Sequence, residues 1–201
     1  MIGVKAKMLI DIMQGSPEWR ALRKTKITAT DAPCILGDNP WKTKKQLLEE
    51  KLGPDIEDMK NARMQRGIDL EPLARNFFHF MKSVEVFPQV IVKEWAMASL
   101  DGMSACGKYM VEIKCPGPHA HSKAVRSGIV PYYYFAQLQH QLYVTDMHYM
   151  YYLSFDGEDG VILEVKRDEA YIGRMIEEEL KFYDCLMKKN LLINLDIPKV
   201  S

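Results

Sequence analysis

The sequence predicts an α/β fold with a central mixed β-sheet flanked by helices. Segments with helical spacing lie between residues 15 and 81, strand-like segments follow up to residue 115, and a helix, two further strands and a last helix complete the chain. This order is typical of a sheet with helices packed on its faces. No repeat, low-complexity tract or long linker interrupts the 201 residues, so residues 1–201 are predicted to form a single domain.

Three short helices are predicted near the start. The stretch GSPEWRALRK has Ser16 as a helix cap and Pro17 at the first helical position. TATDAPCIL predicts a second helix capped by Thr30, and KTKKQLLEEKLG predicts a third that ends at Gly53.

A longer helical segment follows in ARMQRGIDLEPLARNFFHFM, with one apolar face formed by Leu70, Leu73, Phe77 and Phe80. Pro72 predicts a kink or a new first turn within it. Strands are then predicted at VEVF, VIVKEW, MASL and YMVEIKC. After the break at PGPH come a helix at YYYFAQLQHQLYV, strands at HYMYYLSF and GVILEVK, and a last helix at about 168–189.

Composition narrows the function classes. Lys+Arg and Asp+Glu are both 27, so the formal net charge is zero, which argues against a binder that relies on overall positive charge. Seven basic residues nevertheless gather between Arg20 and Lys45, whereas acidic residues dominate from Asp156 to Asp184, so a polyanion would favour the first region. No apolar run is long enough for a membrane span, and no signal peptide is recognised at the start. The four cysteines form no CxxC pair, so zinc is not expected, and reduced thiols in a cytoplasm are the expectation.

The charged residues in MASLDGMSACGKYMVEIKCP indicate a site. In YMVEIKC, Glu112 and Lys114 share one face of the strand, about 7 Å apart. A hairpin through GMSACGK would bring Asp101 beside Glu112. Two converging carboxylates make an oxygen-rich pocket suited to Mg²⁺, and the Ile113 carbonyl can add another oxygen. Lys114 can hold a phosphate oxygen or help to deprotonate the attacking water.

Each of these features alone has a plainer explanation. Asp-Gly is a common turn pair, and Glu112 with Lys114 suits a charged pair on a solvated face. The combined spacing D-x10-E-x-K is more specific, because it supplies all the groups needed for metal-assisted phosphodiester hydrolysis.

With S-x-D-G followed by EIKCP, the chain resembles the PD-(D/E)xK nuclease superfamily, and more narrowly the YqaJ/lambda-exonuclease family of phage recombination nucleases. Leu100 stands where the superfamily motif has a proline, a departure that leaves both acids in place. The resemblance covers about residues 16–190. It implies a restriction-endonuclease-like core and a single nuclease domain over residues 1–201.

The resemblance also assigns roles outside the strands. WRALRKTKITATD is similar to the family's 5′-phosphate-binding motif, which implies Arg23 and Thr30 in that role, with Ser99 as a third contact. RGIDLEPLAR is similar to the helix that carries a further acid, which implies that Glu71 is a ligand or neighbour of the metals. AQLQHQLYVT matches a Q-xxx-Y motif, which implies that Gln139 lies near Lys114, with Gln137 on a different face as a weaker candidate.

The implied enzyme is a 5′→3′ exonuclease that digests one strand of linear double-stranded DNA to mononucleotides and leaves a 3′ overhang. Asp101, Glu112, Glu71 and the Ile113 carbonyl would bind two Mg²⁺ ions, for which Mn²⁺ can substitute. The resemblance further implies a ring-shaped homotrimer, a single-strand annealing protein as partner, and a phage- or prophage-encoded protein in the bacterial cytoplasm. Two alternatives stay open: an endonuclease of the same superfamily, which would cut closed circles, and a non-catalytic DNA-binding module.

Overall fold

The structure is a computed structural model that describes residues 7–54 and 62–195. Its strands are β1 Met8–Ile10, β2 Ile27–Thr28, β3 Phe87–Lys93, β4 Ala96–Met103, β5 Met110–Lys114, β6 Tyr149–Phe155 and β7 Gly160–Lys166. Its helices are α1 Pro17–Thr25, α2 Ala32–Leu36, α3 Lys44–Leu52, α4 Ala62–Lys82, α5 Pro118–Ser127, α6 Tyr132–Thr145 and α7 Glu169–Leu195. No helix in the described part of the chain is long and apolar enough to cross a membrane.

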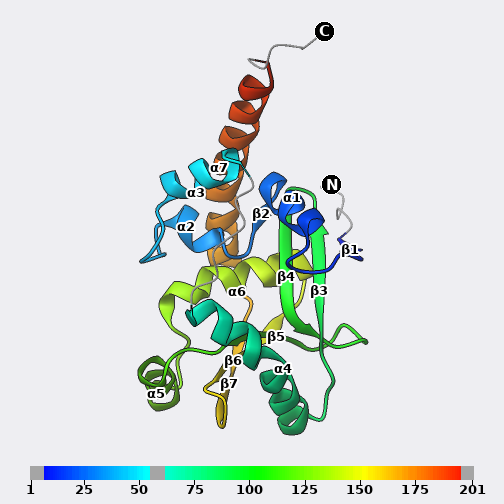
Figure 1. Ribbon diagram of the computed structural model, residues 1–201, viewed down its shortest axis with the longest axis vertical. Coiled ribbons are helices and arrows are strands. Elements are labelled where there is room, and N and C mark those ends of the chain that lie inside the picture. Colours follow the sequence, from blue (N-terminus) through cyan, green and yellow to red (C-terminus); the bar gives the residue numbers. More distant parts are fainter. Residues whose placement is uncertain (1–6, 55–61, 196–201) are drawn as a thin grey trace.

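The described strands form one mixed sheet in the order β1-β3-β4-β5-β6-β7, and β2 pairs with β4. The pairs β5–β6 and β2–β4 are parallel, and the other pairs are antiparallel. Helices flank this sheet, and α7 extends from the body of the molecule toward the C-terminus (Figure 1). The predicted fold class, a mixed sheet flanked by helices, is therefore confirmed.

Alternation along β5 shows how the sheet divides the core. Val111 and Ile113 pack in a cluster with Ala74 and Phe78 of α4. Met110, on the other face, packs in a second cluster with Leu138 of α6 and its neighbours. Because side chains alternate along a strand, Glu112 and Lys114 lie on the Met110 side, toward α6.

The helices before residue 55 form as predicted, with one exception. Ser16 caps α1 by accepting a hydrogen bond from the Trp19 amide, and α3 ends at Gly53. The prediction that Thr30 caps α2 is wrong. Asp31 takes the cap position without a side-chain cap bond, and the exposed Thr30 hydroxyl accepts a hydrogen bond from Arg23.

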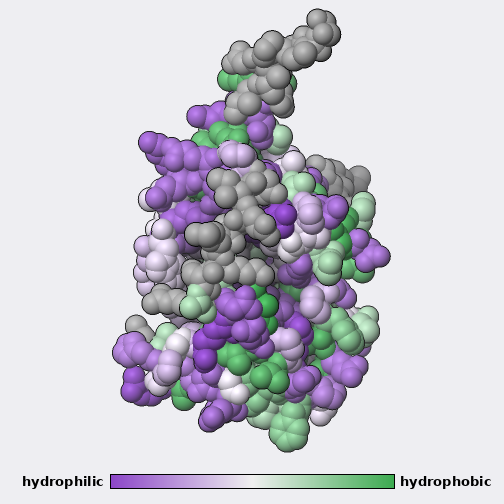
Figure 2. All heavy atoms as spheres, viewed as in Figure 1, coloured by the Kyte–Doolittle hydropathy of each residue, from purple (hydrophilic) through white to green (hydrophobic). Residues whose placement is uncertain are grey.

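Helix α4 runs through Pro72 without a second start. The predicted new turn is absent, because a helix of 21 residues that packs on the sheet tolerates the loss of one backbone hydrogen bond. Its buried face also differs from the predicted one. Ala74 and Phe78 are fully buried, whereas Leu73 and Phe80 are more than half exposed. Hydrophobic side chains are visible at the surface over α4 (Figure 2).

Candidate active site

The register of β4 and β5 places the two predicted acids together. Gly102 pairs with Val111 in an antiparallel ladder, so Asp101 lies opposite Glu112 just beyond the end of this ladder. At this point the Asp101 side chain replaces the backbone as hydrogen-bond acceptor. Its carboxylate accepts a hydrogen bond of 2.7 Å from the Ile113 amide. The predicted approach of Asp101 to Glu112 is confirmed.

A β-bulge in β4 determines how Asp101 is presented. Phe87 pairs with Met103 and Gln89 pairs with Leu100, so β4 contains one residue more than β3 between these pairs. Such bulges redirect side chains at the edges of sites. Gly102 is required beside the bulge, because a Cβ there would lie 2.7 Å from a Val86 methyl carbon and 2.9 Å from one of Val111. The glycine after Asp101 is therefore explained by close packing as well as by the turn propensity of Asp-Gly.

Glu112 is held on every side by donors. Its side chain is 2% exposed, and Oε1 accepts hydrogen bonds of 2.5 Å from both Lys114 Nζ and Gln137 Nε2. Oε2 accepts one of 2.6 Å from Gln141 Nε2. A buried carboxylate needs this full set of partners, and the four groups therefore form a preorganised unit.

The site carries more negative charge than Lys114 neutralises. Burial, and next the charge of Glu112, raise the pKa of Asp101 well above its ordinary range. Burial opposes the charged form of Lys114, but Glu112 and Asp101 outweigh it and raise the pKa of the lysine. Lys114 Nζ also lies 5.0 Å from the centroid of the Tyr134 ring. Lys114 is thus a permanent cation beside two acids that repel one another.

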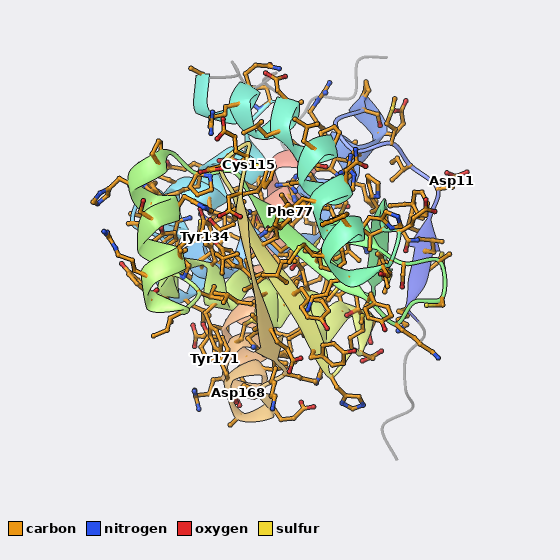
Figure 3. The ribbon with its side chains drawn as sticks, turned by 90° about the horizontal axis from the view of Figure 1, so that it is seen from below. Asp11, Phe77, Cys115, Tyr134, Asp168 and Tyr171 are labelled. Atoms are coloured by element: carbon orange, nitrogen blue, oxygen red, sulfur yellow. The ribbon has the colours of Figure 1, made fainter. Side chains whose placement is uncertain are left out.

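Asp101 and Lys114 open onto a cavity of about 1110 Å³. Its walls include Glu71, Asp101, Ile113 and Lys114, together with the N-terminal turns of α4 and the loop after β5. Arg75 donates hydrogen bonds to Glu71 and to the Asp101 carbonyl, so Glu71 is linked to the same strand. Seen from below, Cys115 and Tyr134, which also line this cavity, lie between α4 and α5 (Figure 3).

The residues present fit a hard divalent cation. Asp101 and Glu71 offer carboxylate oxygens to the cavity, and Glu112 adds a third carboxylate behind them. The Ile113 carbonyl points to the Asp101 side of β5, because the N–H and C=O of one strand residue point the same way. No three His, Cys, Asp or Glu side chains of the described residues lie close enough together to enclose an ion. Carboxylate and carbonyl oxygens are the ligands that hard divalent cations take, with water completing the coordination shell.

Gln139 does not lie where the sequence predicted. Its amide donates to the Lys166 carbonyl at 2.9 Å and accepts from the Asp168 amide at 2.9 Å, which fixes the start of α7. Gln137 and Gln141 occupy the place beside Glu112 instead. Residues four apart share a helix face, so the spacing of Gln137 and Gln141 could have predicted that both face Glu112. Gln139, two residues from each, lies on a different face of the helix.

The three residues predicted to bind a 5′-phosphate come together around Trp19. Arg23 donates a hydrogen bond of 3.1 Å to the Thr30 hydroxyl, and its guanidinium carbon lies 4.5 Å from the Trp19 ring centroid. The Trp19 indole N–H donates a hydrogen bond of 2.8 Å to the Ser99 hydroxyl. Ser99 precedes Asp101 by two residues in β4, so the cluster adjoins the carboxylates. Trp19 is the member that sequence reasoning missed.

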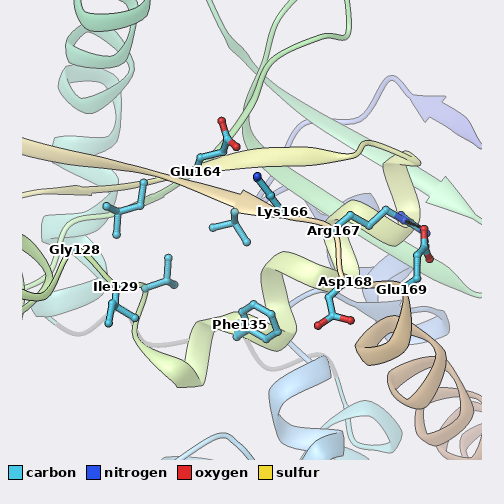
Figure 4. A pocket seen from close by; sticks show the side chains of 11 residues that line it. Gly128, Ile129, Phe135, Glu164, Lys166, Arg167, Asp168 and Glu169 are labelled. Carbon is cyan, nitrogen blue, oxygen red and sulfur yellow. Dashed lines mark hydrogen bonds and ion pairs between the residues drawn. The ribbon is translucent and has the colours of Figure 1, made fainter.

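A second cavity, of about 660 Å³, lies between β7 and the segment that leads into α6 (Figure 4). Some of the charged side chains that line it already have partners. Arg167 forms an ion pair with Glu169 and donates a hydrogen bond to the Leu142 carbonyl. None of the predicted site residues lines it.

Residues 18–148 match the family model described as a YqaJ-like viral recombinase domain. The chain therefore belongs to this family, and the resemblance drawn from its motifs is confirmed. The matched span contains both the acids of β4 and β5 and the cluster around Trp19.

Two curated relatives are uncharacterized. The chain is 29% identical over 159 residues to the protein R354 of Acanthamoeba polyphaga mimivirus, an alignment that covers 70% of this chain and 29% of the relative. It is 25% identical over 176 residues to YqaJ of Bacillus subtilis, covering 83% and 55% of the two chains. The chain thus spans about a third to a half of the length of these relatives.

Solved structures share the fold. The alkaline exonuclease LHK-Exo of Laribacter hongkongensis has a TM-score of 0.79 at 24% identity, covering 92% of this chain and all of that one. The same enzyme in complex with dAMP gives a TM-score of 0.78 at 23% identity. A phage-related exonuclease of Haemophilus somnus gives 0.60 at 15% identity and covers 85% and 98% of the two chains.

Proposed function

We propose that this protein is a Mg²⁺-dependent exonuclease that digests one strand of linear duplex DNA from its 5′ end. The observation that carries the proposal is that Asp101, Lys114 and Glu71 line one cavity, with Glu112 bound to Lys114 behind them. The alkaline and phage-related exonucleases with the same fold support this reaction class.

Each residue has a role in the proposed reaction. Asp101, Glu71, Glu112 and the Ile113 carbonyl would hold two Mg²⁺ ions. When bound, these ions would lower the pKa of water and offset the charge that develops on the phosphate and the leaving 3′-oxygen. Lys114, kept protonated by its acidic neighbours, would hold a phosphate oxygen and orient the attacking water. Gln137 and Gln141 would keep Glu112 in position, the role first given to Gln139.

The Trp19 cluster would select DNA ends. A guanidinium binds phosphate oxygens in a fork, and the Thr30 and Ser99 hydroxyls can complete the anion site. Arg23 is oriented by Trp19 beneath it and by Thr30 beside it. In the described structure no carboxylate forms an ion pair with Arg23, so its charge is available to an incoming phosphate.

The test is digestion of linear duplex with a 5′-phosphate on only one strand, in Mg²⁺. The wild type should remove the phosphorylated strand, leave a 3′ overhang, and leave closed circular duplex intact. Arg23→Ala should lose the preference for the phosphorylated strand. The matched control is Arg20→Ala on the same helix, whose guanidinium binds the Gly15 carbonyl instead, and which should keep the preference.

Three results would overturn parts of the proposal. Cleavage of closed circles would favour an endonuclease of the same superfamily. Equal digestion of both strands would remove the phosphate-binding role of Arg23, Thr30 and Ser99. Tight DNA binding without any digestion, in Mg²⁺ or in Mn²⁺, would favour a non-catalytic DNA-binding module.

We also propose that the protein works as a ring-shaped homotrimer with a single-strand annealing protein, in the cytoplasm of a bacterium that carries the phage or prophage. Enclosure retains DNA without a large basic surface, which agrees with a net charge of zero. A monomeric mass in light scattering at working concentration would remove the ring.

A further inference from the structure

The cavity of the candidate active site has an aromatic wall that the proposed reaction does not use. Trp41 contacts Tyr133 edge-to-face, with ring centroids 5.1 Å apart and an interplanar angle of 77°. Tyr133 contacts Tyr134 in the same manner at 4.6 Å, and Tyr134 lies under the ammonium group of Lys114. Aromatic rings therefore follow one another from the candidate catalytic lysine to the rim of the cavity.

The outermost ring faces solvent. Trp41 is 68% exposed, although burying an indole is strongly favourable. Tyr133 is surrounded by the rings of Trp41, Tyr132 and Tyr134, so the exposed aromatic surface at the rim belongs mainly to Trp41. The backbone around Trp41 is fixed, because Asn39 accepts hydrogen bonds from the amides of Trp41 and Lys42. A large flat side chain is thus held in place at the rim with a free surface.

The rest of the rim suits a nucleotide. Gly67 and Ile68 of α4 also line the cavity, so part of its wall is small and apolar. Arg66 also lines the cavity and adds positive charge there, whereas Lys42, next to Trp41, is paired with Glu50. Stacking on an aromatic ring requires only the flat face that every base has, so such a wall binds bases without regard to sequence.

We propose that Trp41 and Tyr133 form a stacking subsite for an unpaired nucleobase of the strand whose phosphate lies at Lys114. This inference rests on the proposed nuclease function and adds to it how the end of the strand is held away from its complement. A base stacked there cannot pair, so the subsite would stabilise the opened end of the duplex next to the carboxylates.

The experiment uses the Asp101→Asn chain in Mg²⁺ to keep the DNA whole, with intactness checked on a gel. Fluorescence anisotropy measures the dissociation constants of two 5′-phosphorylated single strands. One carries all its bases, and the other has abasic residues at its first three positions. The normal strand should bind about tenfold more tightly. With Trp41→Ala the two strands should bind equally, at the affinity of the abasic strand, whereas Trp41→Phe should keep most of the difference.

Phe80→Ala is the matched control, because Phe80 is an exposed aromatic residue that does not line the cavity. It should leave the discrimination unchanged. The subsite is overturned if Trp41→Ala keeps the tenfold difference, or if it weakens both strands equally. It is also overturned if Trp41→Ala changes only the molecular mass in light scattering, since Trp41 would then contact another protein chain.

Digestion of linear duplex by the unaltered protein, measured in parallel, separates the two proposals. Digestion without Trp41-dependent discrimination removes the stacking subsite and leaves the nuclease. Discrimination that depends on Trp41, without digestion, removes the nuclease and leaves a single-strand-binding cleft.

Discussion

Helix α6 holds two buried polar clusters that differ in charge balance. At one, Gln137 and Gln141 bind Glu112 beside Asp101 and Lys114. At the other, His140 Nδ1 lies 2.8 Å from Glu179 Oε1, and its Nε2 lies 3.2 Å from the Met97 carbonyl. His140 and Glu179 are both completely buried, whereas the Glu112 cluster opens onto a cavity.

The difference between the two clusters is what separates a structural ion pair from the candidate active site. Burial lowers the pKa of His140, but Glu179 outweighs it and raises that pKa, so the pair can carry one charge of each sign. The Glu112 cluster has two acids for one lysine, and the pKa of Asp101 is raised as a result of burial and of Glu112. A sealed, balanced pair stabilises the fold. An open cluster with excess negative charge is a place for a cation.

The largest expected effect is on the open cluster. Asp101→Asn should reduce DNA digestion by about 10⁴-fold, the order of loss for one member of a catalytic unit. The same change should raise the melting temperature of the metal-free protein, because it removes repulsion and keeps an oxygen for the Ile113 amide. Thermal melts in EDTA measure this, and a lower melting temperature would show that the Asp101 charge supports the fold.

The sealed pair should respond in the opposite way. Glu179→Ala should lower the free energy of unfolding by about 3–5 kcal/mol, because it leaves His140 buried without its partner. Urea titration measures the change. Glu178→Ala is the control, since this neighbouring side chain pairs only at the surface with Lys44 and Lys181, and its loss should cost far less. Equal losses would contradict the assignment of the pair to the core.

The glutamines of α6 provide a comparison within one helix. Gln137→Leu should lower digestion by about 10–100-fold, the usual cost of losing a group that orients a metal ligand. Gln139→Leu should leave the rate nearly unchanged and instead reduce stability by about 1–3 kcal/mol, because the Asp168 amide loses its acceptor. Steady-state rates and urea titrations of both variants decide the matter. A larger rate effect at Gln139 would restore the motif-based assignment.

The smallest expected effect is the pH dependence of the sealed pair. The pKa of His140 in the fold lies above its ordinary value of 6.5. Its stabilising contribution is therefore fully present below pH 6.5 and is lost as the pH rises through the folded pKa. The stability difference between wild type and His140→Gln should therefore shrink as the pH rises from 6 to 9. A difference that stays constant from pH 6 to pH 9 would show that His140 is neutral throughout.

The sequence alone determined the fold class and the pairing of Asp101, Glu112 and Lys114. Alternation along YMVEIKC places Glu112 and Lys114 on one face, and a hairpin brings Asp101 opposite, so short-range geometry is sufficient. The motif around Arg23, Thr30 and Ser99 likewise led to residues that the fold brings together through Trp19.

Only the tertiary structure decided which glutamine faces Glu112, how the bulge at Asp101 presents its carboxylate, and that Trp41 meets Tyr133 at the cavity rim. The physical reason is common to all three. The rotation of a helix on a sheet, the register of a bulged strand and the contact of a loop with a distant helix are set by the packing of many side chains. Helical or strand periodicity fixes which residues share a face, and packing fixes where that face points.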